Sequence, residues 1–403
     1  MPNQNLFSEF APVSKAEWLA RVQKDLSSVG MPLAKGRPIS ELTWELPPLS
    51  IDPFAHADDF AELPESLAHT PSNTWEIGEN IDVFNNDFKT ANKQALTALM
   101  GGVNAINFMI DEYPSENQLI TLIKNIESDY ISTHFTEKTR GVNPLNFLKR
   151  LHKKTIEKGE NAQMSLRGMG QLRGSVSFNP ISEGQQNLHE IVELMQWTSE
   201  NLPQFKVLSI DSGHFFKGSE NVVEELTQTL VAANNCINLL KINDLNIENI
   251  NHFIKFNFNI GISYFIEIAK LRAFKLLWAN VLNAHGLNAS THLDSKNLMP
   301  TIHAYISPDP QVEDAHTNKI RATTQAMSAV LGGINMLTIA PSDALNAESS
   351  DFSRRIARNV QHLLQMESYL DKVADPAAGS FYIEKLTNQI AEAVWQQFQE
   401  KAV

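Results

Sequence analysis

One histidine of this sequence stands where an α/β enzyme would place a catalytic group. His214 follows the apolar run Phe205–Ile210 and is separated from it by Asp211, Ser212 and Gly213. If the run is a parallel strand, the histidine lies at the C-terminal end of that strand, where such enzymes carry their chemistry. It could donate a hydrogen bond to a carbonyl group or act as acid or base. The alternative is a turn histidine that binds only backbone.

Two arginines accompany another apolar run. Arg167 and Arg173 flank the start of Leu172–Phe178. A guanidinium group there could bind a phosphate or a carboxylate through paired hydrogen bonds. Arginines that only face solvent are the alternative, and they are common. We take His214 and Arg173 as the candidate substrate-binding residues.

The other histidines do not have the spacing of a metal site. His285, His292 and His303 are spread along the chain without the i, i+4 interval that would place two of them on one helical face. Cys236 is the only cysteine, which excludes an internal disulfide and a zinc site built on cysteines. We predict no metal site.

The segment from Asp314 to Lys319 partly resembles a cofactor-binding motif. Asp314 and His316 resemble the start of the pattern Asp-x-His-x-x-Gly, which supplies the lower axial ligand in cobalamin domains, but Lys319 stands where the glycine is needed. The same residues can begin a long helix, with Asp314 as a favourable charge at its N-terminus. We predict a helix start and no cofactor in this chain.

Apolar runs and helical segments alternate from residue 71 onward. The runs are Val103–Ile110, Tyr130–Phe135, Leu172–Phe178, Phe205–Ile210, Phe256–Gly261, Ile302–Ile306, Ile334–Ile339 and Lys372–Ala374. Helical periodicity lies between them, at Asn86–Leu99, Asn117–Ile126, Pro144–Lys158, Leu188–Asn201, Asn221–Ala233, Ile247–Phe253, Ile266–Leu282, Asp314–Val330 and Asp351–Glu367. This alternation predicts parallel strands with crossover helices. It fits a (β/α)8 TIM barrel, and a doubly wound open sheet is the alternative.

The stretch from Ser350 to Thr387 predicts the last α/β unit. Apolar residues repeat at three- and four-residue steps, which predicts one apolar stripe along a helix: Phe352, Ile356, Val360 and Leu363. Three arginines lie off this stripe: Arg354, Arg355 and Arg358. Lys372–Ala374 is then expected as the eighth strand, and a second helix is expected to begin at Phe381 after the turn 375–380.

The first 70 residues differ in composition from the rest. Glu17–Leu26 can form one short helix, and prolines are dense after it. Proline fixes φ and removes a hydrogen-bond donor, so this part is not expected to form a regular sheet or a long helix. We predict a proline-rich N-terminal arm over residues 1–70, in contact with another subunit, and the barrel over residues 71–403.

Composition limits the partners and the location. The 403 residues carry a formal net charge of −13, which disfavours a general nucleic-acid or anionic-membrane surface. The N-terminus lacks the basic and apolar regions of a secretory signal, and charged residues interrupt every apolar run before it could span a membrane. We expect a cytoplasmic protein that binds neither nucleic acid nor membrane.

Three stretches carry a family resemblance. Residues 351–368 read DFSRRIARNVQHLLQMES, residues 372–387 read KVADPAAGSFYIEKLT, and residues 261–273 read GISYFIEIAKLRA. These words resemble the barrel domain of the methylmalonyl-CoA mutase family, and residues 6–26 are similar to the start of its small subunits. The family implies a (β/α)8 barrel that threads an acyl-CoA along its axis, a separate C-terminal cobalamin domain and the pairing of two similar subunits.

Departures from the catalytic pattern refine this resemblance. Asn80 replaces the tyrosine that catalytic chains place against substrate and corrin, and no counterpart of their carboxylate-binding arginine follows Phe178. The catalytic word R-T-H-S-Q-T-S-G corresponds here to HAYISPDP at residues 303–310. The chain ends soon after Phe398, without room for the cobalamin domain. His214 alone falls at a retained position, that of a histidine near the thioester carbonyl.

The resemblance therefore implies a non-catalytic small (beta) subunit. Its partner would be the catalytic large subunit, which would carry adenosylcobalamin and, with this chain, interconvert methylmalonyl-CoA and succinyl-CoA. Two alternatives remain. The chain could be the barrel subunit of an acyl-CoA mutase whose cobalamin domain lies on another chain, with His214 catalytic. It could also be a non-catalytic barrel that binds acyl-CoA.

Overall fold

The computed structural model describes most of the 403-residue chain. The described residues are 11, 13–28, 42–61, 72–138, 142–161, 172–180, 188–243, 245–287, 298–346 and 349–401. Two residues weighed in the sequence, Arg167 and His292, lie outside these ranges.

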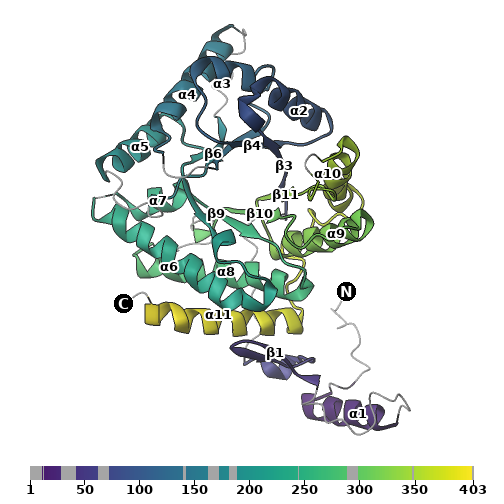
Figure 1. Ribbon diagram of the computed structural model, residues 1–403. Coiled ribbons are helices and arrows are strands. Elements are labelled where there is room, and N and C mark those ends of the chain that lie inside the picture. The colour runs from purple at the N-terminus through teal and green to yellow at the C-terminus, as the bar shows by residue number, and fades with distance from the viewer. Residues whose placement is uncertain are drawn as a thin grey trace, which may run out of the picture.

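The parallel strands close into a barrel. Their order is β7-β6-β5-β4-β3-β11-β10-β9-β8. The two end strands, β7 (Phe205–Lys206) and β8 (Leu208–Asp211), belong to one extended segment that is divided only at Val207. Because β7 pairs with β6 and β8 pairs with β9, the segment joins both ends of the sheet. The other strands are β3 (Glu76–Asp82), β4 (Ala105–Ile110), β5 (Ser132–Glu137), β6 (Arg173–Val176), β9 (Ile254–Asn259), β10 (Ile302–Ile306) and β11 (Met336–Ile339). The predicted (β/α)8 barrel is confirmed, and Figure 1 shows its ring.

Helices surround the ring (Figure 1). They are α2 (Phe88–Met100), α3 (Glu116–Leu122), α4 (Leu145–Asn161), α5 (Leu188–Asn201), α6 (Val222–Lys241), α7 (Ile247–Phe253), α8 (Tyr264–Ala284), α9 (Ala315–Gly332), α10 (Asp351–Met366) and α11 (Phe381–Lys401). Side-chain caps set several starts: the Asp314 carboxylate accepts from the amides of His316 and Thr317 at α9, as the sequence predicted. Among the described residues, no helix has the length and hydropathy needed to cross a bilayer.

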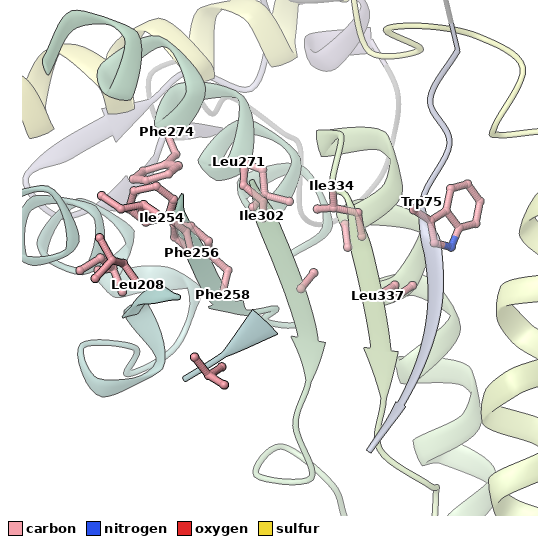
Figure 2. Packing of buried hydrophobic residues seen from close by; sticks show 14 of the residues in the cluster. Trp75, Leu208, Ile254, Phe256, Phe258, Leu271, Phe274, Ile302, Ile334 and Leu337 are labelled. Carbon is pink, nitrogen blue, oxygen red and sulfur yellow. The ribbon is translucent and has the colours of Figure 1, made fainter. Parts of the chain in front are cut away.

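The hydrophobic core lies between the strands and the helices. Phe256 on β9 contacts Phe274 and Trp278 on α8, with ring centroids 4.7 and 4.8 Å apart. Figure 2 shows Phe256, Phe258 and Phe274 gathered on this side of the sheet. Burying a side chain of this kind contributes about 1.5–3 kcal/mol relative to its exposure in water. The outward-facing half of each strand is therefore what fastens the helices to the barrel.

The sequence missed the first strand and misplaced the last. β3 escaped detection because Ile77 and Ile81 are its only large apolar residues, and Glu79 interrupts the apolar alternation between them. The expected strand Lys372–Ala374 is wrong. It lies in turns and bends, and the Lys372 amide donates to the Tyr369 carbonyl 3.1 Å away rather than to a neighbouring strand. The last barrel strand is β11.

The apolar stripe predicted along α10 is divided between the inside and the surface. Phe352 is 52% exposed and Leu363 is 47% exposed, whereas Val360 is buried. The buried face of this helix carries Arg358 and Gln361 beside Val360 and Leu364. The reason is that the facing strand presents a carboxylate, that of Glu79, rather than an apolar side chain.

In the described part of the N-terminal region, a small sheet lies beside α11 and a helix lies farther out (Figure 1). This part contains α1 (Lys15–Ser28) and two short antiparallel strands, β1 (Trp44–Leu46) and β2 (Leu49–Ile51). The sequence did not predict this small sheet, because Pro47 and Pro48 were expected to prevent it. They occupy the turn between the strands, where no ladder donor is needed.

Candidate functional site in the barrel axis

Polar side chains line the inside of the barrel. Lys255 on β9 reaches Ser175 on β6, two strand positions away, so both side chains point inward. Alternation along each strand then places the following residues on the same inner face: Glu76, Asn80, Asp82, Asn107, Met109, Ser132, His134, Thr136, Arg173, Ser209, Asp211, Asn257, Asn259, His303, Tyr305 and Thr338. Bulky branched aliphatic residues usually fill this space. A polar interior implies a use other than packing, or descent from a chain that had one.

Two histidines meet across the axis at mid-height. β5 and β10 stand on opposite sides of the ring, and the rings of His134 and His303 approach edge to face with centroids 4.9 Å apart. Ser175 and Lys255 complete this group, which we call the axial cluster. Lys255 Nζ and His134 Nδ1 both lie 2.7 Å from Ser175 Oγ. Side chains of the protein therefore occupy the axis at this level.

The hydrogen bonds of the axial cluster fix its protonation. Lys255 donates to Ser175 Oγ, so the serine hydroxyl is free to donate to His134 Nδ1. Burial, reinforced by the charge of Lys255, holds the pKa of His134 and of His303 well below the ordinary histidine value. Burial also lowers the pKa of Lys255 to about 8, against the opposing effect of Asp211. Both histidines are neutral at pH 7.

The N-terminal end of the barrel carries charges of both signs. Burial raises the pKa of Glu76, although Ser132 donates a short hydrogen bond to its carboxylate. His134 Nε2 lies 4.0 Å from Glu76 Oε2 without a hydrogen bond, and it has no other partner. Arg173 Nη1 lies 3.9 Å from Glu76 Oε1, and its Nη2 donates to the Tyr130 carbonyl. Arg173 therefore belongs to the end opposite His214, and the structure does not bring the two candidates together.

The C-terminal end is held by amide groups. Asn107 Nδ2 donates to Asn80 Oδ1 over 3.0 Å, while Thr136 donates to Asn107 Oδ1 over 3.0 Å. Asn80 also bonds the Tyr305 hydroxyl, whose pKa burial raises to about 12. Asn80 thus faces the axis at the mouth, and its carbonyl oxygen is engaged by neighbours of the same barrel.

A cavity of ≈ 610 Å³ opens beside Asn80. It lies between β3, the loop after β11 and the first turns of α10. On its α10 side, Arg358 Nη1 donates to Glu79 Oε2 over 2.6 Å, and Arg354 Nη1 lies 3.4 Å from Glu79 Oε1. The sequence predicted only that both arginines lie outside the apolar stripe of this helix, without indicating their contact with Glu79. One carboxylate between two guanidinium groups leaves this wall with one unit of positive charge.

His214 lies at the C-terminal mouth, one short turn after β8. Its Nε2 is 3.9 Å from Asp211 Oδ2, and its side chain is 38% exposed. The Asp211 carboxylate also accepts from the Gly213 amide over 2.9 Å, which shapes the turn. A partly exposed histidine at the mouth has the position that a carbonyl-binding group would need.

A buried ion cluster beneath this turn was missed. Lys270 on α8 lies 2.7 Å from Glu267 and 3.2 Å from Glu225 on α6, and all three are fully buried. Ser212 donates to Glu225 and Ser219 donates to Glu267, which ties the His214 turn to both helices. Burial, together with Glu267, raises the pKa of Glu225 to about 7. The sequence did contain a signal for this cluster: the charged residues Glu267 and Lys270 lie within an otherwise apolar helical segment, EIAKLR.

Two other histidines, His285 and His316, have structural surroundings. His285 Nε2 lies 2.8 Å from Asn234 Oδ1, and His316 lies in the first turn of α9, where Asp314 is occupied as the cap. The Asp314 carboxylate thus caps α9, which is the helix start that the sequence predicted. Within the ranges that the structure describes, no three His, Cys, Asp or Glu side chains are placed to hold a metal ion.

Comparison with known proteins gives similarity along nearly the whole chain. The family model described as methylmalonyl-CoA mutase matches residues 119–402. The methylmalonyl-CoA mutase small subunit of Porphyromonas gingivalis is 32% identical over 98% of this chain and 64% of its own length. The large subunit of Propionibacterium freudenreichii subsp. shermanii is 32% identical over 54% of this chain and 29% of its own length.

Both relatives are longer than the matched chain, which covers less than two thirds of each. Among solved structures, a Xanthomonas albilineans dihydropteroate synthase superposes with a TM-score of 0.39 at 10% identity, over 73% of this chain and 92% of its own.

Proposed function

This chain belongs to the methylmalonyl-CoA mutase family, and from that membership we propose that it is the non-catalytic small subunit of an adenosylcobalamin-dependent methylmalonyl-CoA mutase. Its role would be to bind and stabilise a catalytic large subunit. The small subunit of Porphyromonas gingivalis, similar over 98% of this chain, supports the assignment within the family. The large subunit of another relative supports the existence of such a partner.

The axial cluster is the observation that carries this proposal. An acyl-CoA threaded along the axis would have to pass between His134 and His303, whose ring centroids are 4.9 Å apart. Aromatic rings at this separation are in van der Waals contact, so no extended chain fits between them. Moving His134 aside would break its 2.7 Å contact with Ser175, to which the buried Lys255 also donates.

The C-terminal mouth supports the same role. By the family resemblance, Asn80 stands in place of a catalytic tyrosine, and its short side chain is engaged by Asn107 and Tyr305. It therefore lacks the aromatic ring that would face substrate and corrin. We place adenosylcobalamin on the large subunit, as the family resemblance implies, and in this chain Asp314 caps α9.

Isothermal titration calorimetry of the isolated chain with methylmalonyl-CoA and with succinyl-CoA tests whether the barrel axis is blocked. We expect no saturable heat at ligand concentrations up to the millimolar range, and we expect the chain to co-purify with the large subunit of the same organism. Micromolar binding of either ester by the chain alone would overturn the proposal. Failure to co-purify would remove the subunit role even if the esters did not bind.

The cavity at the C-terminal end of the barrel favours a second candidate function, that of a catalytic barrel subunit. The ≈ 610 Å³ cavity and the partly exposed His214 would suit the barrel subunit of an acyl-CoA mutase whose cobalamin domain is on another chain. The isomerisation of a panel of acyl-CoA esters, after addition of a free-standing cobalamin-domain protein, distinguishes this function from the first.

A further inference from the structure

One wall of the cavity beside Asn80 is formed by a single side of α10. Four residues that line the cavity follow one another at three- and four-residue steps, which return to the same side of a helix: Arg354, Ala357, Arg358 and Gln361. We call these four residues the α10 wall. The cavity volume of ≈ 610 Å³ lies within the range of pockets that hold small organic ligands. The α10 wall therefore presents charged and amide groups to a space of ligand size.

The two arginines of the α10 wall are unequally engaged. Arg358 Nη1 donates to Glu79 Oε2 over 2.6 Å, whereas Arg354 Nη1 lies 3.4 Å from Glu79 Oε1, which is longer than the usual hydrogen bond. The Arg354 side chain is 15% exposed, so water screens its charge only in part. A guanidinium group in this position can hold a carboxylate or a phosphate group of a ligand through paired hydrogen bonds.

The opposite wall carries carboxylates that already have partners. Lys138 Nζ lies 3.1 Å from Asp82 Oδ1, and Asp87 accepts from the Thr90 amide at the start of α2. Both carboxylates line the cavity, and an ionised carboxylate has room for about four hydrogen-bond donors. This wall therefore suits hydroxyl groups and repels a second anionic group. The two walls together favour a ligand with its negative charge at one end only.

Gln361 adds an acceptor at the inner end of the α10 wall. Its side chain is 1% exposed, and its Nε2 donates to the Gly78 carbonyl over 3.3 Å. This bond fixes the amide orientation, because the flipped amide would bring two oxygens together. Within the part of the chain that the structure describes, Gln361 Oε1 has no hydrogen-bond partner. A buried acceptor without a donor is unfavourable, and a ligand hydroxyl group could supply that donor.

We propose that this cavity binds a small hydroxylated anion. Its one anionic group, a phosphate ester or a carboxylate, contacts Arg354, and its hydroxyl groups contact Gln361 and the carboxylates of the opposite wall. The cavity also reaches the loops after β10 and β11, the last two strands of the ring, where TIM barrels frequently bind phosphate groups. The proposal goes beyond the proposed function, because such a ligand need not pass the axial cluster and the site serves a catalytic or a non-catalytic chain.

Isothermal titration calorimetry of the full chain with four matched probes tests the ligand class. D-glucose 6-phosphate and D-gluconate combine hydroxyl groups with one anionic group, a phosphate ester in the first and a carboxylate in the second. D-glucose carries the hydroxyl groups alone, and inorganic phosphate carries the anion alone. We expect saturable binding of at least one hydroxylated anion, and binding roughly 10-fold weaker or more for glucose and for inorganic phosphate. The comparison of the first two probes identifies the anionic group.

Three variants, each checked for folding by circular dichroism, test whether binding occurs in this cavity. Arg354→Gln removes the proposed anion contact and should weaken binding roughly 10-fold or more. Arg355→Gln is the matched control, because it removes the same charge from an exposed side chain that lies over the Phe352 ring. It should change the affinity by less than about twofold. Ala357→Phe fills the cavity from the α10 wall without changing its charge and should abolish binding.

Different results would overturn the site and the ligand class. If the wild-type chain binds neither hydroxylated anion in the millimolar range, the proposal fails. Equal affinity of the wild-type chain and a folded Arg354→Gln or Ala357→Phe variant would show that the ligand binds elsewhere. Glucose or inorganic phosphate bound as tightly as the hydroxylated anions would show that the ligand class is wrong.

Discussion

His134 and His303 show at the scale of single residues how a barrel can keep its fold and lose its passage. The two neutral imidazole rings fill the centre of the barrel. Ser175 supplies a hydrogen bond to the buried Nδ1 of His134. The charge that remains, on Lys255, is held by the same serine. These hydrogen bonds pair His134 Nδ1 and the Lys255 ammonium group, while His134 Nε2 stays without a partner.

These histidines predict a loss of stability in acid. Their folded-state pKa lies well below the ordinary value of 6.5, so below that pH the unfolded chain binds protons that the folded chain does not. The free energy of unfolding should therefore fall as pH drops through 6.5, by up to about 1.4 kcal/mol per pH unit for each histidine. Urea unfolding at pH 7.5, 6.5 and 5.5 measures the slope.

The matched variant is His303→Asn, which removes one titrating ring. Its slope between pH 6.5 and 5.5 should be shallower than that of the wild-type chain. Glu225 acts in the opposite direction in both proteins, because its raised pKa favours the folded state as pH falls. The comparison between the two proteins cancels that contribution, and equal slopes would show that His303 is not held neutral.

At the scale of elements, three charged side chains fasten α11 to the barrel. Arg272 on α8 donates to Asp375, in the turn before α11, and to Glu384 in the first turns of α11, at 2.7 Å for the second. All three are buried. The word KVADPAAGSFYIEKLT, which carries much of the family resemblance, thus encodes the docking of the closing helix rather than a strand of the barrel.

Arg272→Leu should lower the free energy of unfolding by about 3–5 kcal/mol, because two buried carboxylates lose their cation. Asp375→Asn and Glu384→Gln, added to that variant, should restore part of the loss by removing the unpaired charges. Chemical unfolding of the three proteins measures this. A single variant as stable as the wild-type chain would show that the ion pairs do not hold α11.

Element positions were predictable from sequence where periodicity alone decides them. α5 and α7 have the bounds expected from their apolar spacing, and β10 agrees residue for residue. β3 was not recognised because it faces a polar axis on one side, and the tertiary environment of a strand is not written in its own residues. The buried face of α10 was not predicted for a related reason: Glu79, on a strand distant in the sequence, binds Arg358, so an arginine lies on the face that packs inward.

At the scale of the whole molecule, only part of the candidate site could be predicted from the sequence. The family resemblance identified the scaffold, while the roles that it implies for the positions of His214 and Asn80 stay predictions. The axial cluster was not predictable, because it depends on which side chains of opposite strands meet after closure, and His134 and His303 are far apart in the sequence. The spacing of His303 in the sequence says only that it is not part of a helical metal-binding pair.

Mutase activity with adenosylcobalamin, measured for this chain alone, for the large subunit alone and for the two together, tests the central claim most directly. The proposed non-catalytic role predicts no conversion of methylmalonyl-CoA to succinyl-CoA by this chain alone, and conversion when the large subunit is present. The blocked axis and Asn80 are the physical reasons. Conversion by this chain and cofactor without the large subunit would contradict the account.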